Sequence, residues 1–360
     1  MSLPKGSVIR GRGVAARPAG RFAKEQTLPE PGDGNDDTPA PSPATELFPE
    51  TIRSIISRNQ SPDIPFEQSV NPYRGCEHGC VYCYARPSHA YVDLSPGLDF
   101  EQKIFSKPAA ATVLRQELSK RGYRCSPITL GANTDAWQPV ERELLIARQI
   151  LEVLAEFRHP VSIITKSALV ERDRDLLQDL ARDNLVHVLV SVTTMDDELK
   201  RRMEPRTAGP RRRLETIRRL RAAGIPCGVL AAPMIPGLND HELENILAAS
   251  ADAGARYAGY VLLRLPHEVE PIFSDWLHTQ YPLKAAKVLS LIRQVRGGAL
   301  NDAQFGSRMR GAGPIAALLA QRFAAACRRY GFTRESETAL NSAKFRVPAG
   351  PGTQLDLLDQ

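Results

Sequence analysis

The sequence lacks any apolar run near the ~20 residues that a membrane-spanning helix needs, so we expect no membrane partner. Its basic N-terminus also lacks the apolar centre of a secretory signal. Cysteine is scarce, with six in 360 residues, and Cys125, Cys227 and Cys327 are scattered. A disulfide framework is therefore not expected, and a cytoplasmic location is predicted.

Metal-binding histidine pairs are missing as well. The seven histidines include no H-x-x-H or H-E-x-x-H spacing, which argues against a zinc hydrolase.

The net charge is only mildly positive, at +6, and is weak evidence for binding to nucleic acid. The segment Lys200 to Arg221 is more basic, with ten Lys/Arg and two acids. It fits either a phosphate-binding surface or the solvent face of helices.

One short stretch concentrates the remaining cysteines. Cys76, Cys80 and Cys83 have the spacing C-x3-C-x2-C, on a segment that Gly75 and Gly79 make flexible. A [4Fe–4S] cluster usually takes four cysteines, so three thiolates would leave one iron open to a small molecule. The alternative is a structural zinc site or buried thiols. Such a zinc site needs four ligands, which is one more than the three cysteines supply.

This stretch resembles the cluster motif of the radical SAM superfamily, in which the third cysteine follows an aromatic residue, here Tyr82. The resemblance implies that the open iron binds S-adenosylmethionine. Its reductive cleavage would give methionine and a 5′-deoxyadenosyl radical that abstracts hydrogen. An electron donor such as flavodoxin or ferredoxin would be needed as a partner.

Strand-like and helix-like segments alternate after the cysteines, which indicates parallel βα units. About six units are present, and the resemblance implies an α/β fold with a partial (β/α)6 TIM-like barrel. An open α/β sheet is the alternative. We predict a disordered N-terminal extension over residues 1–60, a barrel over 61–300 and a helical C-terminal extension over 301–360. The expected strands cover residues 67–73, 100–107, 128–133, 161–166, 186–193, 227–232 and 257–264.

Residues at the strand ends most resemble the spore photoproduct lyase-like branch of the superfamily, also called DNA repair photolyase-like, over residues 67–264. By this resemblance Cys76, Cys80 and Cys83 ligate the cluster. The S-adenosylmethionine site would be formed by Tyr82, Tyr84, Thr134, Lys166 and Ser191. From the residues alone, Thr134 also fits a helix start, Lys166 an exposed lysine and Ser191 an ordinary strand residue.

Two further segments have two interpretations each. Glu204, in an arginine-rich loop, fits a polar clamp on a ligand or a helix-ending ion pair. The glycine-rich segment 302–313, with Arg308 and Arg310, fits a loop over the barrel mouth or a simple connector.

One departure from the lyase concerns Asn133, which stands where the lyase has a hydrogen-donating cysteine. An amide cannot deliver a hydrogen atom as a thiol can, and Cys125 precedes the strand, at its other end. Repair of thymine dimers is therefore not predicted. The sequence leaves the substrate open, with a nucleic acid as the candidate. The competing hypothesis is a nucleic-acid-binding module with a structural metal site.

Overall fold

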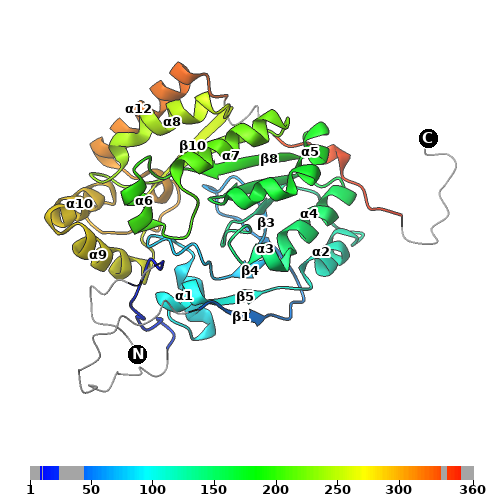
Figure 1. Cartoon of the computed structure of the whole chain (residues 1–360), viewed down its shortest axis with the longest axis horizontal. Helices are drawn as coiled ribbons and strands as arrows, with labels where there is room; N and C mark the ends of the chain where they lie inside the picture. The colour runs from blue at the N-terminus through cyan, green and yellow to red at the C-terminus, as the bar shows by residue number, and fades with distance from the viewer. Residues whose placement is uncertain (1–8, 10, 24–43, 334–338, 350–360) are drawn as a thin grey trace.

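A parallel sheet forms the centre of the molecule (Figure 1). The structure, a computed structural model, describes residues 9, 11–23, 44–333 and 339–349. Within them, a seven-stranded sheet has the order β10-β9-β8-β7-β6-β3-β2, with β2 antiparallel to β3 and the other pairs parallel. These strands are β2 (Ile56–Arg58), β3 (Gln68–Val70), β6 (Ile128–Leu130), β7 (Val161–Thr165), β8 (Val186–Ser191), β9 (Cys227–Met234) and β10 (Tyr257–Leu262).

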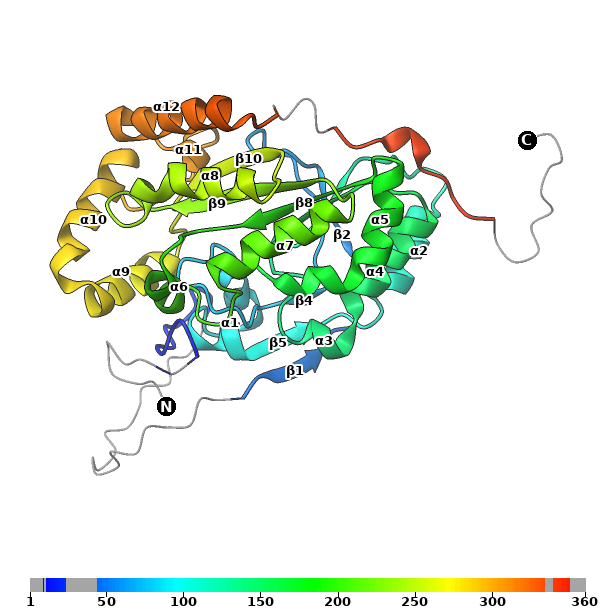
Figure 2. The same ribbon diagram turned by 45° about the horizontal axis from the view of Figure 1, so that its top comes forward.

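Helices follow the parallel strands and cover the sheet, as Figure 2 shows for α4, α5, α7 and α8. The α-helices are α1 (Leu98–Gln102), α2 (Ala110–Leu118), α3 (Glu141–Leu144), α4 (Ile146–Glu156), α5 (Arg174–Arg182), α6 (Asp197–Met203), α7 (Pro210–Ala222), α8 (Leu243–Asp252), α9 (Val269–Gln280), α10 (Pro282–Val295), α11 (Ser307–Arg310) and α12 (Gly313–Tyr330). Short 3-10 helices are η1 (Arg86–Val92), η2 (Ala168–Asp173), η3 (Asp240–Glu242) and η5 (Ser342–Lys344). The predicted α/β fold with a partial (β/α)6 barrel is confirmed.

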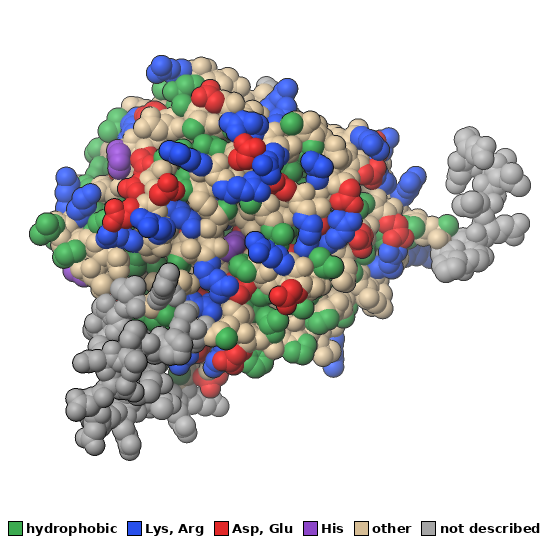
Figure 3. Space-filling model, viewed as in Figure 1, with side chains coloured by type: hydrophobic (Ala, Val, Ile, Leu, Met, Phe, Trp, Pro, Cys, Tyr) green, Lys and Arg blue, Asp and Glu red, His purple; other side chains and the backbone are tan. Residues whose placement is uncertain are grey.

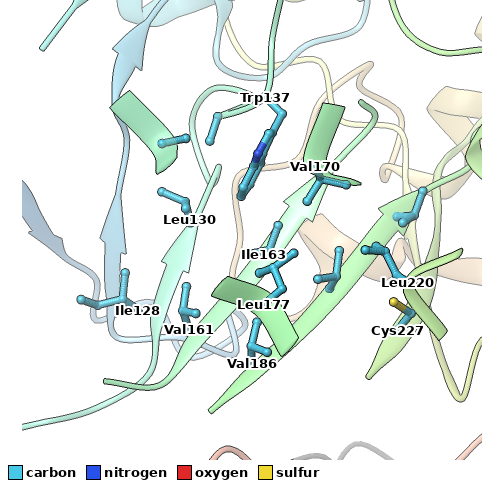
Figure 4. Close-up of a cluster of buried hydrophobic side chains, with 14 of the residues drawn as sticks. Ile128, Leu130, Trp137, Val161, Ile163, Val170, Leu177, Val186, Leu220 and Cys227 are labelled. Carbon is cyan, nitrogen blue, oxygen red and sulfur yellow. The ribbon is translucent and has the colours of Figure 1, made fainter. Parts of the chain in front are cut away.

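The main core lies between the sheet and these helices (Figure 4). Strand β7 has β-branched residues such as Val161 and Ile163, which suit a sheet that is packed on its faces. On α4, Ile146, Ile150 and Leu154 recur every four residues and so share one buried face. Burial of these side chains fixes where each strand ends, and the strand ends position the polar residues discussed below.

A second sheet has the order β1-β5-β4, with β1 at Glu46–Pro49, β4 at Tyr73–Arg74 and β5 at Lys103–Ser106. The strand predicted over residues 100–107 is thus shorter, because its first part belongs to helix α1. The carbonyl of Phe100 in α1 accepts a hydrogen bond from the Cys76 N–H at 3.0 Å, so the helix is anchored on the cysteine segment.

The predicted disordered extension over residues 1–60 differs from the structure where residues are described. Strands β1 and β2 lie within it, and Val14 and Arg12 are buried against the barrel. Polar and backbone contacts hold the N-terminal residues in place, so hydrophobic periodicity in the sequence does not predict their structure. Residues 24–43 lie outside the described residues. The predicted domain boundaries otherwise stay predictions.

Among the helices that the structure describes, none is both long and apolar enough to cross a bilayer. The C-terminal part is helical through α12, as predicted.

Candidate functional site

The cysteine segment leaves the barrel after β3 and β4 and turns twice at glycines. Gly75 and Gly79 have φ of +85° and +67°, a region that favours glycine. A Cβ at Gly79 would lie 2.7 Å from Glu101 Oε2, and one at Gly75 would lie 2.9 Å from Ile104 Cδ1. We call residues 75–84 the cysteine loop. Both turns press its backbone against α1 and β5, which fixes where the thiols lie.

The three thiols of this loop are free and close together. Cys76 and Cys80 are buried, and Cys83 is partly buried. Burial raises the pKa of Cys76, and the nearby Asp135, Cys80 and Cys83 raise it further. Within the described residues, no group of three His, Cys, Asp or Glu side chains is arranged to hold a single metal ion. Thiolates of a [4Fe–4S] cluster bind different irons, so three neighbouring thiols on one loop fit such a cluster.

A buried ion pair between Arg86 and Glu101 supports the cysteine loop. Arg86 donates to the Cys80 carbonyl at 2.9 Å and to Glu101 Oε1 at 2.5 Å, and both side chains are fully buried. The Glu101 carboxylate also accepts the N–H groups of Gly13 and Val14, at 2.9 and 3.0 Å. Glu101 thereby ties the N-terminal segment to the loop, a role that no sequence pattern indicated.

Polar side chains at the carboxyl ends of β7 and β8 meet next to the loop. Lys166 Nζ donates to Ser191 Oγ at 2.8 Å and lies 5.9 Å from the centre of the Tyr82 ring. The Tyr82 hydroxyl contacts Thr193 Oγ1 at 3.3 Å. The structure therefore brings together three of the predicted ligand-binding residues, Tyr82, Lys166 and Ser191. The parallel strand ends explain this, because they meet at one edge of the sheet.

Glu204 joins the same group and is fully buried. It accepts hydrogen bonds from Thr193 Oγ1 at 2.6 Å and from Tyr82, and it forms a buried ion pair with Arg213. Burial acts to raise the pKa of Glu204, but Arg213, Lys166 and the hydrogen bonds outweigh it and lower this pKa to about 2. Its carboxylate is therefore charged and faces Lys166, whose Nζ lies 4.0 Å from Oε1.

Thr134 and Tyr84 lie outside this group. Thr134 Oγ1 is buried and donates to the Gly75 carbonyl at 2.7 Å, so it touches the cysteine loop itself. Tyr84 is 51% exposed, and its hydroxyl donates to the Ala132 carbonyl. Asn133 is exposed, and its N–H donates to Asn71 Oδ1 at 2.8 Å.

His78 and Cys125 have other surroundings. His78 Nδ1 lies 3.4 Å from Asp135 Oδ2, and Asp135 also accepts the Lys166 N–H at 2.8 Å. His78 and the Lys166 N–H thus contact the same carboxylate, which helps to hold the backbone at Lys166. Cys125 precedes β6, at the end of that strand opposite to the cysteine loop, as predicted.

The basic segment from Lys200 to Arg221 is largely paired with acids. Arg213 is buried against Glu204, while Arg212 and Arg219 both contact Glu171. Figure 3 shows Lys and Arg side chains interspersed with Asp and Glu over this region. These pairs favour the solvent face of helices over a phosphate-binding surface.

Comparison with protein families matches residues 70–249 to the Radical SAM superfamily. A protein of Mycobacterium tuberculosis (strain ATCC 25618 / H37Rv), named as uncharacterized, is 38% identical over 233 residues, which are 64% of this chain and 68% of the relative. An uncharacterized protein of Methanocaldococcus jannaschii is 28% identical over 217 residues, 59% of this chain and 76% of that protein.

Among solved structures, spore photoproduct lyase complexed with dinucleoside spore photoproduct has a TM-score of 0.58. The alignment covers 79% of this chain and 80% of the lyase, at 14% sequence identity. At that identity, the likeness is one of fold. The match to the family spans half of the chain and includes the cysteine loop and β4 to β9. This chain therefore belongs to the radical SAM superfamily, whose cofactors are a [4Fe–4S] cluster and S-adenosylmethionine.

Proposed function

We propose that Cys76, Cys80 and Cys83 hold a [4Fe–4S] cluster and that the protein reductively cleaves S-adenosylmethionine bound beside it. When bound, this pair of cofactors supplies a 5′-deoxyadenosyl radical able to abstract hydrogen. The observation that carries the proposal is a polar group in which Tyr82 of the cysteine loop meets Lys166, Ser191 and Glu204.

Three members of this group, Lys166, Ser191 and Tyr82, have a chemistry that suits S-adenosylmethionine. The Lys166 ammonium can bind the carboxylate of the methionine part by a charge-assisted hydrogen bond. The Ser191 hydroxyl can contact a ribose hydroxyl, and the Tyr82 ring lines the same space. Glu204 accepts hydrogen bonds from Tyr82 and Thr193, while Thr134 donates one to the Gly75 carbonyl. We propose that Glu204 and Thr134 position the site.

The proposed substrate is a nucleic-acid component. A lyase of the same fold is known in complex with dinucleoside spore photoproduct, and this motivates the choice. Asn133 has no S–H group, so we propose that the hydrogen returned to any product radical comes from elsewhere than this position. The proposed electron donor is a flavodoxin or a ferredoxin.

The test is anaerobic reconstitution followed by iron and sulfide analysis and by quantification of 5′-deoxyadenosine with dithionite and S-adenosylmethionine. We expect about four irons per chain and accumulation of 5′-deoxyadenosine. Substitution of Cys76, Cys80 and Cys83 by Ala should abolish both, whereas the control variants Cys125→Ala and Cys327→Ala should retain both. Unchanged 5′-deoxyadenosine formation in the triple variant would overturn the proposal.

The competing hypothesis is a nucleic-acid-binding module with a structural metal site. It predicts bound zinc in place of iron and no 5′-deoxyadenosine under any reductant. The same metal analysis therefore separates the two hypotheses.

A further inference from the structure

A guanidinium with no carboxylate partner in the described part of the chain lies at the same edge of the barrel. Arg264 follows β10 and is partly buried. Its Nη1 lies 3.8 Å from Met309 Sδ, and its Nε is buried and has no hydrogen-bond partner within residues 9, 11–23, 44–333 and 339–349. Among the described residues, no carboxylate oxygen lies within 4.0 Å of it, whereas Arg86, Arg213 and Arg308 each have such a partner.

The surroundings of Arg264 leave its charge poorly compensated. Burial lowers the pKa of Arg264, and the neighbouring Arg308 lowers it further, while Tyr84, Asp63 and Asp302 oppose this effect. Asp63, however, is already bound by Arg308 through two hydrogen bonds of 2.7 and 2.6 Å. A partly desolvated cation beside a second cation binds an added anion more strongly than an exposed one.

The segment beside Arg264 is fixed in place. Arg296 donates to the carbonyls of Ser307 and Arg308, at 3.0 and 2.8 Å, and to the Leu262 carbonyl at 3.1 Å. These bonds connect α11 to the end of β10, against which it packs (Figure 2). An anion at Arg264 would therefore bind to a preorganised site rather than order a loop.

Two exposed aromatic rings lie beside this pair of cations, one near Arg264 and one against Arg308. Tyr84 belongs to the cysteine loop and is 51% exposed, and it is close enough to Arg264 to act on its charge. Phe305 is 60% exposed, and the Arg308 guanidinium lies 4.7 Å from its ring centre. Aromatic faces beside cations are the combination that binds single-stranded nucleic acid, because bases stack and phosphates pair.

We propose that Arg264 binds a backbone phosphate of a single-stranded nucleic acid, with Tyr84 and Phe305 as stacking surfaces for its bases. This inference rests on the proposed function, because Tyr84 would place the bound strand beside the cluster. It assigns substrate binding to the end of β10 and α11, and not to the basic helix α7.

The test is fluorescence anisotropy with a labelled oligonucleotide of about ten nucleotides, using the reconstituted protein without reductant. We expect Arg264→Gln to weaken binding by about tenfold or more and to reduce the salt slope by about one. Arg218→Gln on α7 is the matched control and should bind as the wild type does. Arg264→Lys keeps the charge and should bind more tightly than Arg264→Gln. Thermal melting of each variant checks that it is folded.

DNA and RNA strands of one sequence, run in parallel, identify the source of the phosphate. Phe305→Ala should weaken binding of a normal strand and leave that of an abasic strand unchanged. The inference is overturned if the wild-type protein binds neither strand, or if Arg264→Gln binds as tightly as wild type. Failure of the proposed function would appear separately, as missing iron or missing 5′-deoxyadenosine in the wild-type protein.

Discussion

Removal of the positive charge opposite Glu204 should destabilise the protein strongly. In Arg213→Met the carboxylate of Glu204 stays fully buried without its closest ion-pair partner, while Lys166 Nζ remains 4.0 Å from Oε1. Loss of one member of a buried pair costs about 3–5 kcal/mol. Arg213 is the largest of the influences that lower the pKa of Glu204, ahead of Lys166 and the hydrogen bonds from Thr193 and Tyr82, so its removal takes away the main stabilising charge beside this carboxylate.

The sign of the pH dependence follows from the direction of this shift. Because the folded-state pKa of Glu204 lies below its ordinary value, the contribution to stability is present above pH 4.5 and is lost as pH falls toward 2. The destabilisation by Arg213→Met should therefore be full at neutral pH and should shrink in acid, where the carboxyl becomes neutral.

Urea unfolding of the metal-free, reduced protein measures this effect. We expect Arg213→Met to lower the urea midpoint while the dependence of the free energy of unfolding on urea stays the same. The double variant with Glu204→Gln should recover most of the lost stability. Arg218→Met, on the exposed side of the same helix, should leave the midpoint unchanged. The reasoning is refuted if the double variant loses as much free energy of unfolding as the Arg213→Met and Glu204→Gln variants lose in sum. The coupling energy between the two residues would then be near zero.

Three further outcomes are expected. Lys166→Met should weaken S-adenosylmethionine binding about tenfold or more in calorimetry, with the exposed Lys284→Met unaffected; equal affinities would remove Lys166 from the site. Gly13→Ala should speed trypsin cleavage within residues 11–23, because its Cβ would lie 1.8 Å from the Gly79 carbonyl oxygen, whereas Gly122→Ala, with open space around it, should cleave as wild type does. Ile163→Ala should lower the free energy of unfolding by about 2–5 kcal/mol, and a loss under ~1 kcal/mol would contradict its place in the core.

The sequence predicted the six parallel strands, and β7 and β8 gave the clearest signal because both are β-branched segments between helix-forming residues. Its cysteine spacing also identified the superfamily. Helix α9 was missed, since Pro271 in its first turn interrupts the pattern. The first part of the predicted strand over residues 100–107 became helical, because α1 bonds to the cysteine loop rather than to a strand.

The support of the site was harder to predict. Arg213 sits in a basic run that looks solvent-exposed, yet it is buried because Glu204 lies opposite it in space. Glu101 and the segment of residues 11–23 meet through backbone N–H groups and a close glycine contact. Neither interaction leaves a periodic signal, because both depend on residues distant in sequence.

Paramagnetic resonance of the reduced, anaerobically reconstituted protein is the most direct measurement of whether one iron is open to a ligand. We expect a [4Fe–4S]⁺ signal whose shape changes when S-adenosylmethionine is added. A signal that is identical with and without S-adenosylmethionine, or protein that contains no iron, would contradict the proposed use of Cys76, Cys80 and Cys83.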